Sequence, residues 1–185
     1  MLALDYLLLR CQEGDQAAFA EFFRCYKDKV YRLAVTILRD VQEAEDITQE
    51  VFLRLLRQIH SYRGEAAFDT WLTAITVNAC RDRLRRQKLR RALPLEWLRG
   101  RARQQDTDEA VEQRQWKRSL WEQVDLLEDK YRLPVILFYY EGLPAGEVAR
   151  VLGLTVSAVY ARLNTARVRL RAVFQEPEVR EADNH

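Results

Sequence analysis

The residues best suited to chemistry in this chain are an aromatic ring and an amide, Trp71 and Asn78, followed by a basic segment. Seven positions separate them, which is two turns of an α-helix, so both lie on one side of such a helix. Residues 81–91 contain seven Lys or Arg and one acid, Asp82. An aromatic ring beside amide and guanidinium groups can stack on unstacked bases and hydrogen-bond to them. The spacing alone equally permits a core Trp71 followed by a solvated basic helix end.

Two amphipathic helices must position these groups, one at about residues 42–60 and one at about residues 67–90. The second helix buries Phe68, Leu72, Ile75 and Ala79. On the first helix a polar face lies opposite the apolar one and has Leu53 at its centre. Its members are Asp46, Gln49, Glu50, Leu53, Arg54 and Arg57. Spacing alone favours an ordinary solvated face, because one exposed Leu is common, but a small partner-docking face would look the same.

Two segments resemble a known family. Glu-Asp-Ile-Thr-Gln-Glu-Val-Phe at 45–52 and Phe-Asp-Thr-Trp-Leu-Thr-Ala-Ile-Thr-Val-Asn at 68–78 are similar to region two of extracytoplasmic-function sigma factors. These are the small promoter-specificity subunits of bacterial RNA polymerase. The resemblance implies that the first helix docks on the largest polymerase subunit through Asp46, Gln49, Glu50 and Leu53. It implies that the second helix and the loop 61–66 melt and read the minus-ten promoter element as single strands. The promoter-facing residues would be Tyr62, Arg63, Trp71, Asn78, Arg81 and Arg85.

The composition favours an all-α protein, since the 185 residues include only six Gly and four Pro, and the length permits one ordinary domain or two small ones. The break in helical pattern after Arg91, together with the two resemblances, favours two small helical domains joined by a flexible linker. The net charge is +2, so a nucleic-acid partner has to be argued from local charge. The three Cys and two His show no zinc-ligand spacing, and we expect Cys11, Cys25 and Cys80 to be small buried residues. No metal site, cofactor, small-molecule substrate or catalytic constellation is predicted, so the chain is not expected to be an enzyme. Without a long apolar run or a basic signal-peptide start, we expect a cytoplasmic protein that is not itself in the membrane.

Residues 92–112 lose helical periodicity and contain Pro94 and Gly100, which predicts a linker. Trp97 and Leu98 are its large apolar residues and should dock on a domain or a partner. The first domain then spans residues 1–91 and the second spans 113–177, and the acidic tail 178–185 is expected to be disordered.

The second domain is predicted to contain a helix-turn-helix. Pro134 should lie close after the start of one helix and Pro144 at the first position of the next. Gly153 ends that short helix and Thr155 caps the last one. We expect an inward stripe on the last helix, made of Val156, Val159, Leu163, Ala166, Leu170 and Val173.

Small polar residues on the outward face of the last helix, with Arg on both sides, suit a DNA major groove flanked by phosphate contacts. The central residues are Ser157, Ala161, Asn164 and Thr165, and the flanking ones are Arg162, Arg167, Arg169 and Arg171. A merely solvated amphipathic helix is the other interpretation.

This domain is similar to region four of the same family, as in Leu-Glu-Asp-Lys-Tyr-Arg at 127–132 and Gly-Leu-Thr-Val-Ser-Ala-Val at 153–159. The resemblance implies recognition of the minus-thirty-five element as duplex DNA. The chain has Tyr160, Ala161 and Arg162 where the family commonly has a basic residue, Ser and Arg. It also has Thr165 where a further Arg is usual, so the upstream promoter sequence cannot be inferred from relatives. The residues predicted to face this element are Ser157, Tyr160, Ala161, Arg162, Asn164, Thr165 and Arg167.

The sequence therefore predicts a sigma factor whose partners are core RNA polymerase, promoter DNA and, as the family implies, an anti-sigma factor. Two alternatives belong to other classes. One is a helix-turn-helix repressor with a helical sensing or dimerising domain, and the other is a helical adaptor that binds only protein.

Overall fold

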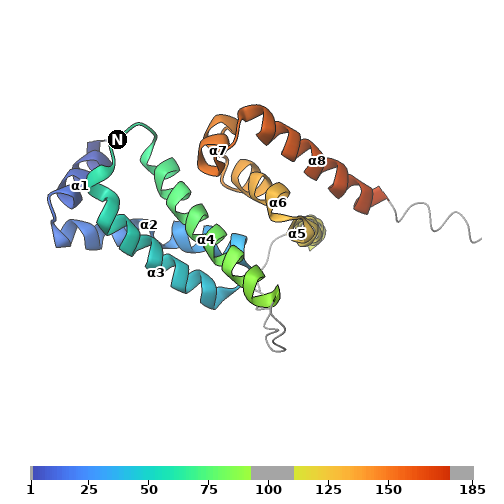
Figure 1. The fold of residues 1–185 in the computed structure, drawn as a ribbon, viewed down its shortest axis with the longest axis horizontal. Coiled ribbons are helices and arrows are strands. Elements are labelled where there is room, and N and C mark those ends of the chain that lie inside the picture. The colour runs from blue at the N-terminus through green and yellow to red at the C-terminus, as the bar shows by residue number, and fades with distance from the viewer. Residues whose placement is uncertain (1, 93–110, 176–185) are drawn as a thin grey trace, which may run out of the picture. The chain divides into compact units, whose positions relative to one another are not determined.

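The computed structural model describes residues 2–92 and 111–175, and within these ranges the regular structure is helical with no strand, as predicted (Figure 1). The chain divides into two compact units, with the boundary inside 93–110. No helix of the described ranges is long and apolar enough to cross a membrane. Trp97, Leu98 and the tail 178–185 lie outside the described residues, and so does most of the predicted linker.

Residues 2–92 of the first unit form the α-helices α1 (Leu2–Gln12), α2 (Gln16–Leu38), α3 (Val41–Gln58) and α4 (Phe68–Ala92). The side chain of Asp15 accepts hydrogen bonds from the first turn of α2, and Asp40 accepts one from the N–H of Glu43 in α3. These caps satisfy backbone donors that a helix start leaves without partners. A short 3-10 turn, η1 (Ile59–Ser61), follows α3.

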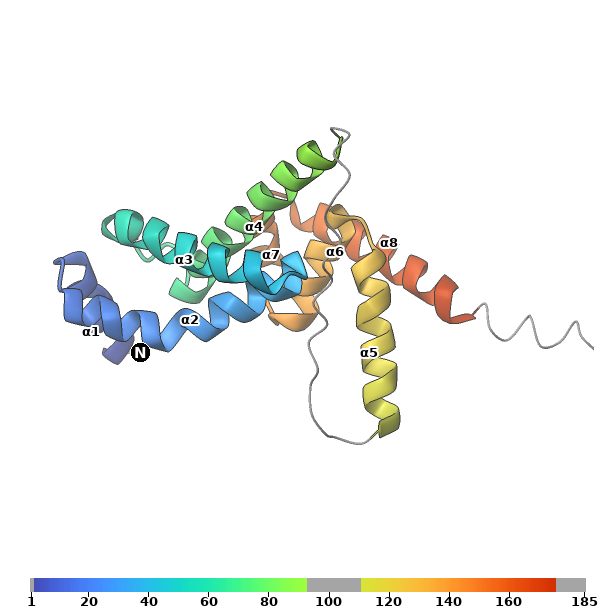
Figure 2. The same ribbon diagram turned by 90° about the horizontal axis from the view of Figure 1, so that it is seen from below.

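Helices α2, α3 and α4 pack against one another, and α1 packs on α2 and η1 (Figures 1 and 2). The apolar face of α3 is buried at Ala44, Val51 and Leu55, and the four residues predicted to be buried on α4 are buried as well. Phe22 of α2 lies at the centre, with its ring 5.2 Å from Phe68 and 4.6 Å from Tyr26. Cys25 is exposed, so its predicted burial is wrong, while Cys11 and Cys80 are buried as expected.

The second unit consists of α5 (Val111–Leu126), α6 (Asp129–Val135), a π-helical segment η2 (Ile136–Tyr140), α7 (Ala145–Leu152) and α8 (Val156–Gln175). Helix α5 begins two residues before the predicted domain start at 113. Pro134 is the sixth residue of α6, so its predicted place near the helix start is wrong. Proline has no N–H for the helical ladder, and the wider π-helical segment begins two residues after it, at Ile136.

A left-handed glycine and an N-capping threonine determine the turn between α7 and α8. Gly153 ends α7 at φ +66°, a left-handed conformation that suits glycine. Thr155 accepts a hydrogen bond from the N–H of Ala158, as an N-cap does. Pro144 caps α7 rather than occupying its first position, so the predicted boundary is wrong by one residue.

The apolar stripe of α8 is shorter than predicted. Val159, Leu163 and Ala166 are buried, but Val156 is 45% exposed and Val173 is 43% exposed. The central residues pack against α6 and α7, whereas the two valines at its ends project into solvent.

Candidate nucleic-acid interface

An aromatic cluster joins the loop before α4 to the first turns of that helix. The ring of Tyr62 lies 5.0 Å from that of Trp71 and 5.3 Å from that of Phe68. The hydroxyl of Tyr62 donates a hydrogen bond of 2.9 Å to the carbonyl oxygen of Ala66, which ties the two ends of the loop together. Burial raises the pKa of the Tyr62 phenol above its ordinary value. Trp71 is half-buried, so its ring packs partly in the core and remains partly accessible for stacking on a base.

The amide and two of the guanidinium groups predicted to face DNA on α4 are exposed. Asn78 and Arg81 point to solvent, and so does Arg63 in the loop. The side chain of Arg85 is 77% exposed and lies 3.5 Å from Asp82. Asn78, Arg63 and Arg81 therefore keep their hydrogen-bonding capacity for a partner, while Arg85 is shared with Asp82.

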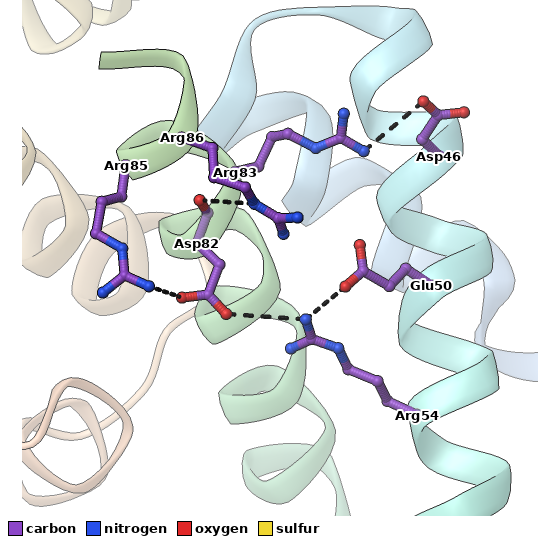
Figure 3. Close-up of polar contacts among 7 residues, drawn as sticks. All are labelled: Asp46, Glu50, Arg54, Asp82, Arg83, Arg85 and Arg86. Atoms are coloured by element: carbon purple, nitrogen blue, oxygen red, sulfur yellow. Dashed lines mark hydrogen bonds and ion pairs between the residues drawn. The ribbon is translucent and has the colours of Figure 1, made fainter. Parts of the chain in front are cut away.

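Other arginines beside this face bind acids of the first unit (Figure 3). Arg83 lies 2.6 Å from a carboxylate oxygen of Glu43 and 3.7 Å from one of Asp46, and so joins α4 to α3. Arg54 of α3 pairs with Glu50 and lies 3.8 Å from Asp82. The positive charge available to a phosphate is therefore smaller than the count of basic residues suggests.

The polar face of α3 divides into two parts. Asp46 and Glu50 take part in the ion pairs to Arg83 and Arg54 (Figure 3). Gln49 is exposed, and Leu53 is 55% exposed. Gln49 and Leu53 are therefore the residues of the predicted docking set that are open to a partner without first losing an internal contact.

The sequence pattern missed the pairing of Glu43 with Arg83. The Glu50–Arg54 pair could have been found, since residues four apart meet on a helix surface. The bond between Glu43 and Arg83 joins residues forty apart and depends on how α3 packs on α4, so the sequence offered no local signal for it.

The outward face of α8 presents the predicted set largely to solvent. Ser157, Tyr160, Ala161 and Asn164 are exposed, while Arg162 and Thr165 are partly buried. The hydroxyl of Thr165 donates to the carbonyl oxygen of Ala161 at 3.0 Å. That bond occupies the single hydroxyl proton of Thr165, which leaves its oxygen as an acceptor.

Two arginines that flank this face are engaged differently. Arg167 donates from Nε and Nη2 to the hydroxyl oxygen of Tyr139 at 2.9 and 2.7 Å. Arg169 pairs with Glu128 at 2.9 Å. Hydrogen bonds from Arg169 and then Lys130 lower the pKa of the Glu128 carboxyl. Arg167 is therefore held by a hydroxyl group, whereas Arg169 is held by a carboxylate that it shares with Lys130.

Within the described parts of both units, no group of His, Cys, Asp and Glu side chains is placed to hold a metal ion.

Both units match known protein families. Residues 22–90 match Sigma-70 region 2, and residues 117–170 match Sigma-70, region 4. The chain is 33% identical to the ECF RNA polymerase sigma factor SigW of Bacillus subtilis over 174 residues, which cover 89% of this chain and 93% of that protein. It is 36% identical over 160 residues to the ECF RNA polymerase sigma factor SigM of Mycobacterium tuberculosis, covering 85% of this chain and 77% of that one.

Solved structures are similar in fold at low identity. One is the sigma factor RpoE in complex with the anti-sigma factor NepR from Bartonella quintana. It has a TM-score of 0.70 and 16% identity, with 85% of this chain and 96% of that chain covered. Another is CnrH in complex with the cytosolic domain of CnrY, with a TM-score of 0.63, 22% identity and 97% of each chain covered.

Proposed function

The chain belongs to the extracytoplasmic-function (ECF) RNA polymerase sigma factors, and we propose that it directs core RNA polymerase to promoters through two DNA-binding surfaces. The first unit melts the minus-ten element and recognises its bases as single strands. The second unit recognises the minus-thirty-five element as duplex. The polymerase performs the chemistry, and this chain contributes promoter specificity from the cytoplasm.

The observation that carries the proposal is the surface on α4, where the exposed amide of Asn78 lies two turns from the Tyr62–Trp71 ring pair. Stacking of a base on an aromatic ring contributes roughly 1–3 kcal/mol, and the stacking face is accessible only when the base has left the duplex. Arg63, Arg81 and Arg85 are exposed around these groups and can bind the phosphates of the same strand.

The polymerase contact is assigned to the exposed part of α3, with Gln49 and Leu53 at its centre and Asp46 and Glu50 at its edge. An exposed apolar side chain surrounded by polar groups fits the anatomy of a small docking interface. Asp46 pairs with Arg83 of α4 and so helps to fix α3 against α4, whereas Glu50 pairs with Arg54 of α3 itself.

The minus-thirty-five contact is assigned to α8, whose short or amide side chains, Ser157, Ala161 and Asn164, let a helix approach base edges. Tyr160 and Thr165 lie at the edge of this face and replace the basic residues that are common there in the family. Arg162 and Arg167 supply phosphate contacts.

We also propose regulation by an anti-sigma factor. Two solved structures of similar fold are complexes, one of a sigma factor with an anti-sigma factor and one of CnrH with the cytosolic domain of CnrY. They cover 85% and 97% of this chain, respectively, which supports a comparable complex of this chain with an anti-sigma factor.

Transcription with purified components tests the proposal. The protein is mixed with core RNA polymerase and a promoter library, and transcripts with defined start sites are expected. A repressor would bind DNA without producing transcripts, and an adaptor would bind polymerase without either result. The family matches to both units already argue against these two alternatives.

A further inference from the structure

The C-terminal end of α3 and its 3-10 turn leave backbone carbonyl groups that need hydrogen-bond donors. Two of them, at Ile59 and Tyr62, receive hydrogen bonds from the side-chain amide of Gln12, with lengths of 3.0 and 3.1 Å. The carbonyl of Ile59 also accepts from the N–H of Tyr62 at 3.2 Å. One amide on α1 therefore holds both ends of the turn that leads into the loop.

Helix α1 is anchored well enough to serve as a support for this amide. Leu7, Leu8 and Cys11 are buried, and the helix packs on both α2 and η1. Gln12 is the last residue of α1 and is itself half-buried. The side-chain amide of Gln12 is therefore held on a helix that is packed in place, and its two hydrogen bonds are partly shielded from water.

Tyr62 transmits this anchoring to the loop. Its carbonyl is held by Gln12, its hydroxyl by Ala66 and its ring by Trp71. Between these fixed points the loop residues Arg63, Gly64 and Glu65 are exposed, and Gly64 has a φ of +73° that favours glycine. A loop held at both ends in this way is pre-organised, so less ordering entropy is lost when a strand binds.

We propose that Gln12 is a positioning residue for single-stranded promoter DNA, which it affects through the backbone of Tyr62 without contacting a base. This inference rests on the function proposed above, because it gives α1 a role in the same minus-ten site. It predicts that loss of the two amide donors weakens single-strand binding and leaves polymerase binding intact.

The variants are Gln12→Met, which keeps length and apolar packing, and Gln12→Glu, which keeps shape but has no donor at neutral pH. The matched control is Glu13→Gln at the neighbouring exposed position. Holoenzyme formed with each full-length variant is titrated with a labelled single-stranded oligonucleotide carrying the non-template minus-ten sequence. Loss of two hydrogen bonds should weaken this binding roughly tenfold, with the control unchanged.

Two further measurements separate positioning from a general loss of structure. Affinity for core polymerase should stay within twofold of wild type. In the free protein, amide hydrogen exchange should accelerate in residues 61–66 and not in α4.

Unchanged oligonucleotide affinity in both Gln12 variants would overturn the inference. A parallel loss of oligonucleotide and core-polymerase affinity, or faster exchange throughout the first unit, would overturn it too, because the residue would then be purely structural. If wild-type holoenzyme itself failed to bind the oligonucleotide, the function proposed for the first unit would be wrong. A defect confined to the Gln12 variants leaves that function intact, so the two outcomes can be distinguished.

Discussion

The contact between Arg167 and Tyr139 allows a charge effect on DNA binding to be separated from an orientation effect. An arginine side chain has five N–H donors. Two of them, one on Nε and one on Nη2, go to the hydroxyl of Tyr139, so three remain for a phosphate. The hydroxyl therefore fixes the direction of the guanidinium group while leaving most of its donors available.

Two single variants and their combination follow from this geometry. Arg167→Ala removes one phosphate contact, so the slope of log affinity against log salt should become shallower by about 0.9. Tyr139→Phe keeps the charge, so the slope should be unchanged while affinity falls about fivefold, which corresponds to about 1 kcal/mol for lost orientation. The double variant should bind like Arg167→Ala alone, because the two residues act as one unit.

The assay is a salt titration of the full-length protein with duplex containing the minus-thirty-five element, with folding of each variant monitored by circular dichroism. Additive losses in the double variant would refute the reasoning, since Tyr139 would then contact DNA independently. A shallower slope in Tyr139→Phe would refute it as well.

Three further outcomes are expected. Leu53→Ala should weaken core-polymerase binding in a pull-down titration by about 2 kcal/mol, as truncation of an interface hot spot does, whereas Gln58→Ala, at an exposed position on another side of α3, should leave it unchanged. Asn164→Ala should change the consensus selected from randomised upstream elements, and an identical consensus would exclude base contact by this residue. The pKa of Asp15 is lowered chiefly by the N–H of Ala18, so its carboxylate stabilises the fold above the ordinary pKa of aspartate and loses that effect as the pH falls through the lowered value. Asp15→Asn should therefore flatten the decline of unfolding free energy below about pH 4, as measured by denaturant titration.

The part of this fold that could be predicted from the sequence depends on local rules. Gly153 and Thr155 define the turn between α7 and α8 through backbone conformation and capping, which require only neighbouring residues. Asp15 and Asp40 define helix starts for the same reason. The start of α6 could not be placed, because its N-cap residue, Glu128, makes no side-chain capping bond.

The parts of the site that could not be predicted depend on packing between distant segments. Gln12 meets Ile59 and Tyr62 only because α1 packs on η1, and nothing in the composition of either segment indicates that contact. The prediction that Val156 is buried was wrong for a related reason. A periodic stripe indicates which side of a helix faces inward, but not how far the neighbouring helices extend along it.

The central claim is that the exposed face of α4 acts on single-stranded promoter DNA, and Asn78→Ala tests it on two templates. Holoenzyme with this variant is compared with wild type on duplex promoter and on the same promoter with a pre-melted bubble over the minus-ten element. Loss of one or two base hydrogen bonds should slow open-complex formation on duplex roughly tenfold, while closed-complex binding through α8 survives. Recovery on the bubble would assign Asn78 to melting, and a residual, base-dependent defect would assign it to recognition. Wild-type behaviour on both templates would contradict the claim, because Asn78 would then have no promoter role.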